Sequence, residues 1–577
     1  MGSRNKVLLT NQARSTIEIN LPDGRVIEGK RGTPIGEFLQ ILPEFFDPPM
    51  VGAVVDGDLR ELTFPLQKDA AVRPITMSDS DGSKIYRRSL TFLLETAFED
   101  LFPEQILTID YSVPNGGYFC RVLDQNPLTK EEIDQLNLRM NELVKLDLPI
   151  KREKLLLQDA IAYFKAKNYL DKVRLLKYRQ KPYLVLYSLN EHRDYHHGYM
   201  VPSTGFLKWF NLSTQGNGFI LQYPRRNTPT ELFQLPKYSK LLGIFQQYYD
   251  WLNKLGIGSV GALNEAIEKG SIREVILVSE AQHEQKIAQI AQKIAELSKE
   301  VKVVLISGPS SSGKTTFSKR LAIQLLSLGI SPFALEMDNY FVDREITPRD
   351  SNGQYDFEAF EAINRNLLEE QLEQLTSGVE VTLPQYNFKK GKSEPGDVVK
   401  LEKGQMVIIE GIHGLNPQLL AHFSEKKTFR IYTSCLTQLN LDRYNRISTT
   451  ETRMLRRIVR DAQSRGFSAQ RTIEMWESIR RGEREYIFPY QENANEIFNS
   501  ALVYELSALK SFAEPLLRQI PHGTYEFLEA KRLLAILEWF LPVNQELIPD
   551  NSILREFIGD SILKDFRVWG STKNGSG

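Results

Sequence analysis

The sequence predicts a multidomain α/β protein in which a small β-rich unit and an α+β unit precede a unit built on a parallel, doubly wound sheet. The 577-residue chain is too long for a single hydrophobic core. Strand-like runs with hairpin turn signals dominate residues 15–77. From residue 301 to about 545, apolar strands alternate with amphipathic helices, which favours a parallel sheet.

The composition is that of an ordinary globular protein, with 41% hydrophobic and 25% charged residues. The 72 basic and 73 acidic side chains give no global attraction to nucleic acid or anionic membrane. Cys120 and Cys435 form neither a metal-ligand pattern nor a disulfide framework. No apolar run reaches the roughly 20 residues that span a bilayer, and the first residues lack a signal peptide's apolar core. We therefore expect a cytoplasmic protein without membrane contact.

The first unit, residues 1–78, is predicted to be a β-grasp domain. Residues 16–20 alternate as a strand should, and Pro22-Asp23-Gly24 is a hairpin turn signal. A second strand is expected at 26–29, a short helix at 34–42, and further strands at 51–55 and 71–75. The polar residues 78–82 predict a boundary.

The second unit, residues 79–225, is predicted to be α+β. We expect helices over 89–101, after residue 128 and over 151–166, and strands at 106–113, 117–122, 183–189 and about 218–223. A helical connector over 226–300, with a helix at 281–300, leads into the α/β unit of residues 301–545. Residues 546–577 are expected to form a C-terminal helix and a flexible tail, which includes the Gly/Ser-rich segment 570–577.

A P-loop lies between the apolar run 303–306 and an amphipathic helix. Residues 308–315 read GPSSSGKT, the G-x-x-x-x-G-K-[ST] pattern. Loop amides and the positive end of the helix favour phosphate, Lys314 can reach the β- and γ-phosphates, and the Thr315 hydroxyl can hold magnesium. The alternative is a Ser/Gly-rich turn that fits by chance. The residues expected to bind ATP are Gly308, Pro309, Ser310, Ser311, Ser312, Gly313, Lys314, Thr315 and Thr316.

Two carboxylates follow apolar strands of the same unit. Asp338 should lie at the carboxyl edge of the sheet, where it can accept the proton of an attacking hydroxyl and help to organise magnesium. Glu410 ends another strand and could contact magnesium or its waters. The alternatives are a solvated loop carboxylate for Asp338 and a capping or turn carboxylate for Glu410.

Residues 301–545 resemble the uridine kinase and phosphoribulokinase family. The motifs that carry the resemblance occur in the family's order: the P-loop, Glu336–Phe341, Tyr355–Glu358, Leu383–Phe388, Ile408–Ile412, Thr452–Asp461 and Ser464–Gly466. The resemblance implies an ATP- and Mg²⁺-dependent kinase whose base is Asp338.

The resemblance also implies roles on the substrate side and in an arginine-rich lid. Asp356 would hold sugar hydroxyls, and Tyr386 and Phe388 would offer aromatic surface to a base. As alternatives, Asp356 could be the N-cap of a helix through Phe360, and the two aromatic residues could pack in a core. The lid positions expected to contact phosphate are Arg457, Arg460 and Arg465. Their alternative is a solvated basic helix face paired with Glu451 and Asp461.

Two departures from uridine kinases leave the base open. Residues 389–392 read KKGK where those enzymes carry a histidine, and Phe467 stands where they carry an arginine. The phosphate machinery is unaffected by either change. The acceptor is thus expected to be a nucleoside of undefined base, with another hydroxylated acceptor as the alternative.

Residues 16–77 resemble the TGS domain of threonyl-tRNA synthetases, and residues 83–225 resemble their editing domain. The LPDG turn at 21–24, the VDG turn at 55–57 and the VPSTG string at 201–205 carry the resemblance. The histidine and cysteine positions of the editing site read Arg88, Phe92, His196 and Met200 here, and only Asp194 is kept. We therefore expect no deacylase or zinc site, and we expect His192, His196 and His197 to be surface or hydrogen-bonded histidines in a loop.

These observations predict an ATP-dependent nucleoside kinase that phosphorylates a 5′-hydroxyl. Lys314, Asp338, Arg457 and Arg460 are the expected catalytic residues, and Thr315, Glu410 and Asp338 the expected magnesium ligands. One alternative is an RNA-associated protein that docks tRNA through its N-terminal half. Another is a signalling or scaffold protein that binds nucleotide without turnover. Relatives suggest homo-oligomerisation.

Overall fold

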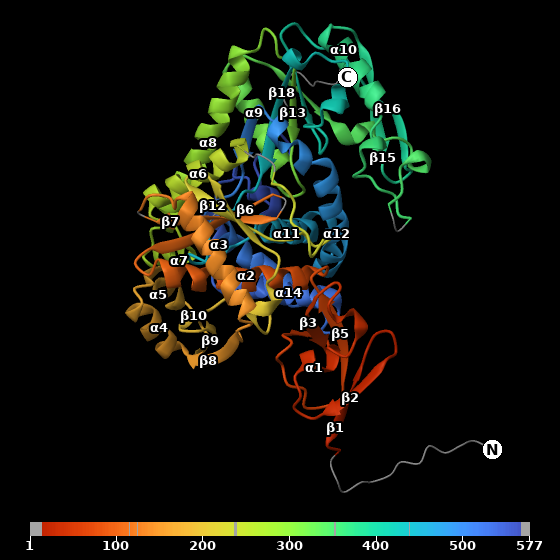
Figure 1. Ribbon diagram of the computed structural model, residues 1–577. Coiled ribbons are helices and arrows are strands. Elements are labelled where there is room, and N and C mark those ends of the chain that lie inside the picture. The colour runs from red at the N-terminus through yellow and green to blue at the C-terminus, as the bar shows by residue number, and fades with distance from the viewer. Residues whose placement is uncertain are drawn as a thin grey trace, which may run out of the picture.

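The computed structural model describes residues 14–114, 116–123, 125–235, 239–350, 353–437 and 439–566. A small sheet at the N-terminal end protrudes from one end of the molecule, an α+β unit lies in the middle, and a parallel sheet lies at the far end (Figure 1). The predicted tail at 570–577 lies outside the described residues.

The N-terminal sheet has five strands in the order β2-β1-β5-β3-β4. β1 runs parallel to β5, and the other neighbours are antiparallel. Its elements are β1 (Thr16–Asn20), β2 (Val26–Lys30), α1 (Ile35–Leu39), β3 (Met50–Val55), β4 (Asp58–Arg60) and β5 (Ala70–Thr76). α1 is shorter than expected because Pro43 opens a separate 3-10 turn. The three-residue β4 is too short for a periodic signal.

The polar residues 78–82, predicted as a boundary, follow β5 and include the start of the next helix. α2 (Ser80–Leu101) begins within them, nine residues earlier than expected from its apolar pattern. The Asp79 carboxylate accepts hydrogen bonds from the backbone N–H and hydroxyl of Thr76, at 2.7 and 3.0 Å. This turn joins β5 directly to the buried central helix.

The α+β unit has two antiparallel sheets, β10-β9-β8 and β11-β12-β7-β6. Its elements are α2, β6 (Ile106–Val113), β7 (Gly117–Leu123), α3 (Lys130–Lys145), β8 (Lys151–Leu156), α4 (Leu157–Ala166), α5 (Leu170–Leu176), β9 (Tyr183–Leu189), β10 (His192–Asp194), β11 (Asn211–Gln215) and β12 (Gly218–Gln222). The helix predicted over 151–166 is wrong in its first six residues. They form β8, because pairing with β9 overrides local helix propensity.

Three helices connect this unit to the parallel sheet: α6 (Ser239–Leu255), α7 (Val260–Glu268) and α8 (Ile272–Glu296). α8 begins nine residues earlier than predicted and packs along α9. Ile287, Ile290 and Ile294 of α8 share one buried core with Phe317 and Leu321 of α9. The connector is thus part of the core of the parallel-sheet unit.

The parallel sheet has the order β14-β17-β13-β18-β19, with every pair parallel. Alternate residues of β13 face opposite sides: Val304 and Ile306 join the core of α8 and α9, whereas Val303 and Leu305 join the core of α10. Burial on both faces is typical of a doubly wound sheet. The predicted parallel α/β sheet is confirmed.

The remaining elements surround this sheet and include one exposed hairpin (Figure 1). In chain order they and the strands are β13 (Val303–Ser307), α9 (Lys314–Ser327), β14 (Pro332–Glu336), α10 (Arg365–Thr376), β15 (Val381–Asn387), β16 (Lys392–Val399), β17 (Met406–Glu410), β18 (Thr428–Ser434), α11 (Thr449–Arg460), α12 (Ala469–Tyr486), β19 (Glu496–Asn499), α13 (Glu505–Leu517), α14 (Tyr525–Leu537) and α15 (Arg555–Ile558). Across the described residues, no helix is both long and apolar enough to cross a bilayer.

Candidate active site

The P-loop joins β13 to α9, and its glycines allow close backbone approach. A Cβ on Gly308 would lie 1.9 Å from the carbonyl oxygen of Thr433. Gly313 has φ +84°, and a Cβ there would lie 2.6 Å from Ile553. Lys314 is the first residue of α9, and its Nζ donates to the carbonyl oxygens of Gly308 and Pro309 at 2.9 and 3.2 Å. The loop is thus closed around its lysine at a helix N-terminus.

Two carboxylates bind backbone N–H groups of the loop and the first turn of α9. Glu483 Oε1 accepts the N–H of Ser310 at 3.1 Å. Glu556 Oε2 accepts the N–H and the hydroxyl of Thr316 at 3.1 and 2.9 Å. Amides arranged in this way favour anions. Sequence reasoning missed both residues, because they come from α12 and α15, far along the chain, and have no local motif.

Asp338 and Glu410 lie at the same edge of the sheet as the P-loop. Asp338 belongs to a 3-10 turn directly after β14, and Glu410 is the last residue of β17. Because β17 lies between β14 and β13, the three carboxyl ends are neighbours. Thr315 Oγ1 donates to Glu410 Oε1 at 2.8 Å. The placement expected for both carboxylates is therefore observed.

The local electrostatics raise the pKa values of these carboxyl groups. Burial raises the pKa of Glu410 to about 7, and Lys314 opposes the rise. Burial and then repulsion from Glu483 raise the pKa of Glu358 to about 7. Asp338 keeps solvent contact, but the surrounding protein desolvates its carboxyl group and raises its pKa. Sequence reasoning missed Glu358, although it lies in the Tyr355–Glu358 motif.

The residues present fit a magnesium ion. Mg²⁺ prefers hard oxygen ligands, and the Thr315 hydroxyl and Glu410 carboxylate oxygens already lie in contact. Burial is the first cause of the raised pKa values of Glu410, Glu358 and Asp338, and the Lys314 cation opposes the rise in each. A divalent cation would stabilise these groups in their ionised form.

Three arginines of the predicted lid surround Asp461. Arg457, Arg460 and Arg465 lie 3.2, 3.1 and 3.6 Å from its carboxylate oxygens, around a π-helical turn over Asp461–Arg465. Arg457 Nη1 also donates to Ser310 Oγ at 2.6 Å. The expected pairing with Asp461 thus occurs, but Arg457 and Arg460 are partly buried rather than solvated.

Two further arginines of α11 are wholly buried. Arg453 forms an ion pair with Glu483 and donates to the carbonyl oxygen of Ser310 at 2.9 Å. Arg456 forms an ion pair with Glu505 at 2.5 Å. These arginines fix α11 against the P-loop.

The proposed substrate-side residues differ in their surroundings. Asp356 accepts the backbone N–H of Glu358 at 3.1 Å. It is not an N-cap of the short helix Phe360–Ala362, which begins after Ala359, so that alternative is wrong. Tyr386 is only 4% exposed and packs against Phe341, whereas Phe388 is 56% exposed. The core-packing alternative therefore applies to Tyr386.

The histidines of the α+β unit are not surface residues. His192 lies in β10, and both His192 and His196 are buried. Their Nε2 atoms lie 3.5 and 3.3 Å from Glu95 Oε2, so both are hydrogen-bonded. The loop prediction is wrong for His192 and correct for His196 and His197. Ligand atoms of Glu95, His192 and Asp194 lie within 4.8 Å of one another, a grouping that the sequence did not predict. Lys172 Nζ, 2.9 Å from Asp194, already supplies a cation there.

The parallel sheet, with a P-loop and two carboxylates at its carboxyl edge, defines a P-loop α/β domain of the kinase type. Residues 303–507 match the model of the phosphoribulokinase / uridine kinase family, so this segment carries a domain of that family. The match covers the P-loop, both edge carboxylates and the lid arginines.

Two solved structures are each similar to a part of this chain that is about as long as the family match. One is a candidate fructose transport system kinase from Silicibacter sp. TM1040, 18% identical, with a TM-score of 0.27, covering 37% of this chain and 98% of that protein. The other is a candidate uridine kinase from Bacillus stearothermophilus, 23% identical, with a TM-score of 0.22, covering 37% of this chain and 100% of that protein.

The N-terminal half matches threonine–tRNA ligases. The ligase from Desulforamulus reducens is 30% identical over 197 residues, which are 34% of this chain and 31% of the ligase. The ligase from Paraburkholderia xenovorans is 32% identical over 197 residues, with the same shares. The chain therefore spans about a third of the length of these relatives.

Proposed function

We propose that the protein is an ATP- and Mg²⁺-dependent kinase that transfers the γ-phosphate to the 5′-hydroxyl of a nucleoside. The observation that carries the proposal is the contact of Thr315 with Glu410 beside Lys314, on the sheet edge that also holds Asp338. The family domain over residues 303–507 supports the same reaction class. The base stays open, because the stretch 389–392 lacks the histidine of uridine kinases.

The roles follow from charge and reach. Loop amides and Lys314 would bind the phosphates, and Asp338, with its raised pKa, would accept the proton of the attacking hydroxyl. Thr315 and Glu410 would hold Mg²⁺, which supplies charge neutralisation when bound. Arg457, already in contact with the loop at Ser310, would stabilise charge on the transferred group, with Arg460 and Arg465 nearby.

The proposed nucleoside-binding residues are Asp356 and Phe388. Asp356 has one carboxylate oxygen engaged with the Glu358 amide, which leaves acceptor capacity for sugar hydroxyls. Phe388, exposed at the end of the β15 strand, would offer its ring to a base, with Tyr386 packed edge-on beneath it at 5.0 Å.

The test is ATP consumption by the purified chain with magnesium and a panel of nucleosides, ribulose 5-phosphate and bulk tRNA. We expect one nucleoside to stimulate ATP consumption strongly and to yield its 5′-monophosphate. Stimulation by ribulose 5-phosphate alone would reassign the acceptor. If no nucleoside stimulates ATP consumption, the proposal is contradicted.

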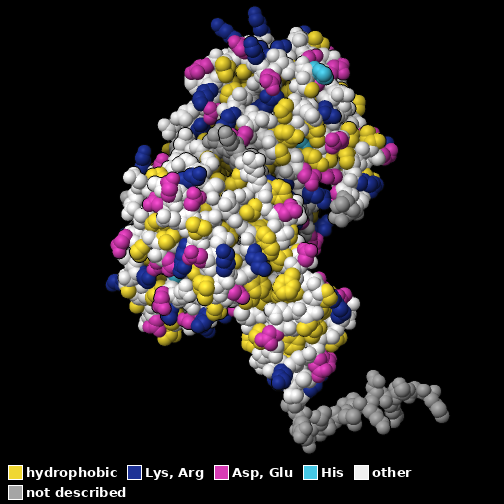
Figure 2. Space-filling model, in the orientation of Figure 1, with side chains coloured by type: hydrophobic (Ala, Val, Ile, Leu, Met, Phe, Trp, Pro, Cys, Tyr) yellow, Lys and Arg dark blue, Asp and Glu magenta, His cyan; other side chains and the backbone are white. Residues whose placement is uncertain are grey.

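A second candidate is an RNA-associated protein that docks tRNA through its N-terminal half. The match to threonine–tRNA ligases favours it. The mixed sheet order β2-β1-β5-β3-β4 supports a β-grasp of the TGS type. Acidic and basic side chains are interspersed on the face drawn in Figure 2, and no single-sign patch dominates it. Retention of tRNA that falls steeply with salt would support this candidate.

A further inference from the structure

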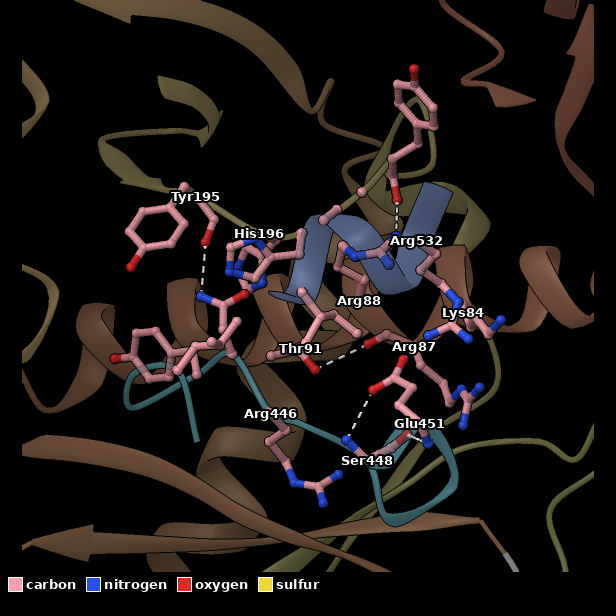
Figure 3. A pocket seen from close by; sticks show the side chains of 18 of the residues that line it. Lys84, Arg87, Arg88, Thr91, Tyr195, His196, Arg446, Ser448, Glu451 and Arg532 are labelled. Atoms are coloured by element: carbon pink, nitrogen blue, oxygen red, sulfur yellow. Dashed lines mark hydrogen bonds and ion pairs between the residues drawn. The ribbon is translucent and has the colours of Figure 1, made fainter. Parts of the chain in front are cut away.

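A cavity of about 450 Å³ lies between the α+β unit, α14 and the segment that leads into α11. Lys84, Arg87 and Arg88 line it from α2, Arg532 lines it from α14, and Arg446 lies on the segment before α11. It does not include the P-loop or the edge carboxylates. Figure 3 shows Lys84 and Arg532 gathered on one side of it, with Tyr195 and His196 on the other.

The cavity carries an excess of positive charge. Eight lysine and arginine side chains line it, against three aspartate and glutamate side chains. In the parts of the chain that the structure describes, Arg87, Arg88 and Arg446 form no ion pair with a carboxylate. They donate instead to the carbonyl oxygens of Ser83, Tyr199 and Asp110, at 3.0, 2.6 and 3.3 Å. These carbonyl oxygens accept some of the arginine hydrogen bonds, but they do not neutralise the arginine charges.

Lys84 and Arg532, which do have carboxylate partners, share one of them. Lys84 lies 3.2 Å from Glu529 Oε2, and Arg532 is ion-paired with both Glu529 and Glu451. Burial, and then the charge of Arg532, lower the pKa of Lys84. Burial also lowers the pKa of Arg532 to about 10. A guanidinium keeps its proton near neutral pH. A bound anion would therefore reduce the repulsion between the positive charges of Lys84 and Arg532.

Aromatic side chains line the opposite end. The rings of Tyr195 and Trp539 are stacked with centroids 6.0 Å apart, and the His197 ring lies 5.0 Å from Trp539. The Arg179 guanidinium lies 4.9 Å from the Trp539 ring. His197 Nε2 is buried and has no hydrogen-bond partner among the described residues. This end of the cavity is therefore aromatic, with one polar atom, His197 Nε2, left without a partner among the described residues.

We propose that this cavity is a second ligand site, separate from the P-loop, that binds a free nucleotide with its phosphate among Arg88, Arg532 and Lys84 and its base toward Trp539. Arginine forks match phosphate oxygens in pairs. Pockets for small ligands have volumes of roughly 300–1,000 Å³, a range that includes this cavity. One end of the cavity is cationic and the other is aromatic, as a nucleotide has an anionic phosphate at one end and a planar base at the other. The inference does not depend on the kinase reaction, since no residue of that site is used.

Calorimetric titration of the whole chain with each nucleoside 5′-monophosphate, the matching nucleoside and inorganic pyrophosphate tests the proposal. The variants are Arg88→Gln in the cavity, Lys314→Ala in the P-loop and Arg139→Gln as a control. Arg139 is an arginine of the same unit that pairs with Asp100 and Glu142 outside the cavity. Charge-assisted hydrogen bonds to a phosphate account for roughly tenfold or more in affinity each.

We expect one monophosphate to bind the wild type, Lys314→Ala and Arg139→Gln within about twofold of one another, and Arg88→Gln at least about tenfold more weakly. The matching nucleoside and pyrophosphate should each bind more weakly than that monophosphate. Lys84→Gln, judged by the same criterion, replaces Arg88→Gln if the latter does not fold. The proposal is overturned if no monophosphate binds, or if binding is lost with Lys314→Ala and kept in Arg88→Gln.

Discussion

Glu483 reaches from α12 into the P-loop, where its carboxylate accepts the Ser310 N–H at 3.1 Å. The same oxygen is ion-paired with Arg453 of α11, and both side chains are 1% exposed. Three segments that are distant in the sequence thus meet at one buried carboxylate. Arg480 adds a second cation, 3.0 Å from the other oxygen.

Glu483→Gln should lower the free energy of unfolding by about 3 kcal/mol, because removing one partner leaves a buried arginine charge without compensation. Urea unfolding followed by circular dichroism measures the change. Glu474→Gln on the same helix is the control, since Glu474 pairs with Arg471 at the surface and should cost less than about 1 kcal/mol. Equal losses in the two variants would contradict the assigned role of Glu483.

Asp338→Asn should reduce phosphoryl transfer by about 100-fold or more while leaving ATP affinity within about twofold, because general-base catalysis contributes 10²–10⁴-fold. Steady-state turnover and equilibrium binding of ATP separate the two quantities. Lys314→Ala, in contrast, should weaken ATP binding itself. Unchanged turnover in Asp338→Asn would remove this residue as the base.

Glu410→Gln should raise the magnesium concentration required for half-maximal activity by about tenfold, because it replaces an anionic oxygen with a neutral amide next to Thr315. Activity measured over a magnesium titration gives this value. Glu336→Gln is a matched control at the end of the neighbouring strand β14. A shift of the same size in both variants would indicate a general loss of charge instead of a lost ligand.

The stability of the α+β unit should fall as the pH rises from about 6.5 to 9. Burial opposes protonation of His192, but the carboxylates of Glu95 and Glu99 outweigh it and raise the pKa of His192 to about 9. A group with a raised pKa in the folded state stabilises fully below its unfolded value of about 6.5, and the contribution is lost through the folded value.

The stability lost over this pH range should be on the order of 2–3 kcal/mol in the wild type. His192→Asn should lack this pH dependence, although it is less stable at pH 6. Urea unfolding at pH 6 and pH 9.5 on both proteins measures the difference. An identical pH dependence in the two proteins would show that another group titrates.

The sheet edge was predictable from the sequence because each of its parts has a local signal. The glycines and Lys314 follow one apolar strand, Asp338 follows another, and Glu410 ends a third. Glu483 and Glu556 have no such signal, since only the folded chain brings them to the loop. The same limit explains β8, whose partner strand lies about 30 residues away, and Glu95, which meets His192 only through the packing of α2.

α11 has one end in the cavity and the other at the P-loop. Ser448, its N-cap, lines the cavity, and Arg453 and Arg457 contact the loop from the following turns. The helix therefore links two ligand sites within a single rigid element of about 18 Å. Thermodynamic reciprocity then sets a strict condition. Whatever factor a cavity ligand imposes on ATP affinity, ATP must impose the same factor on that ligand.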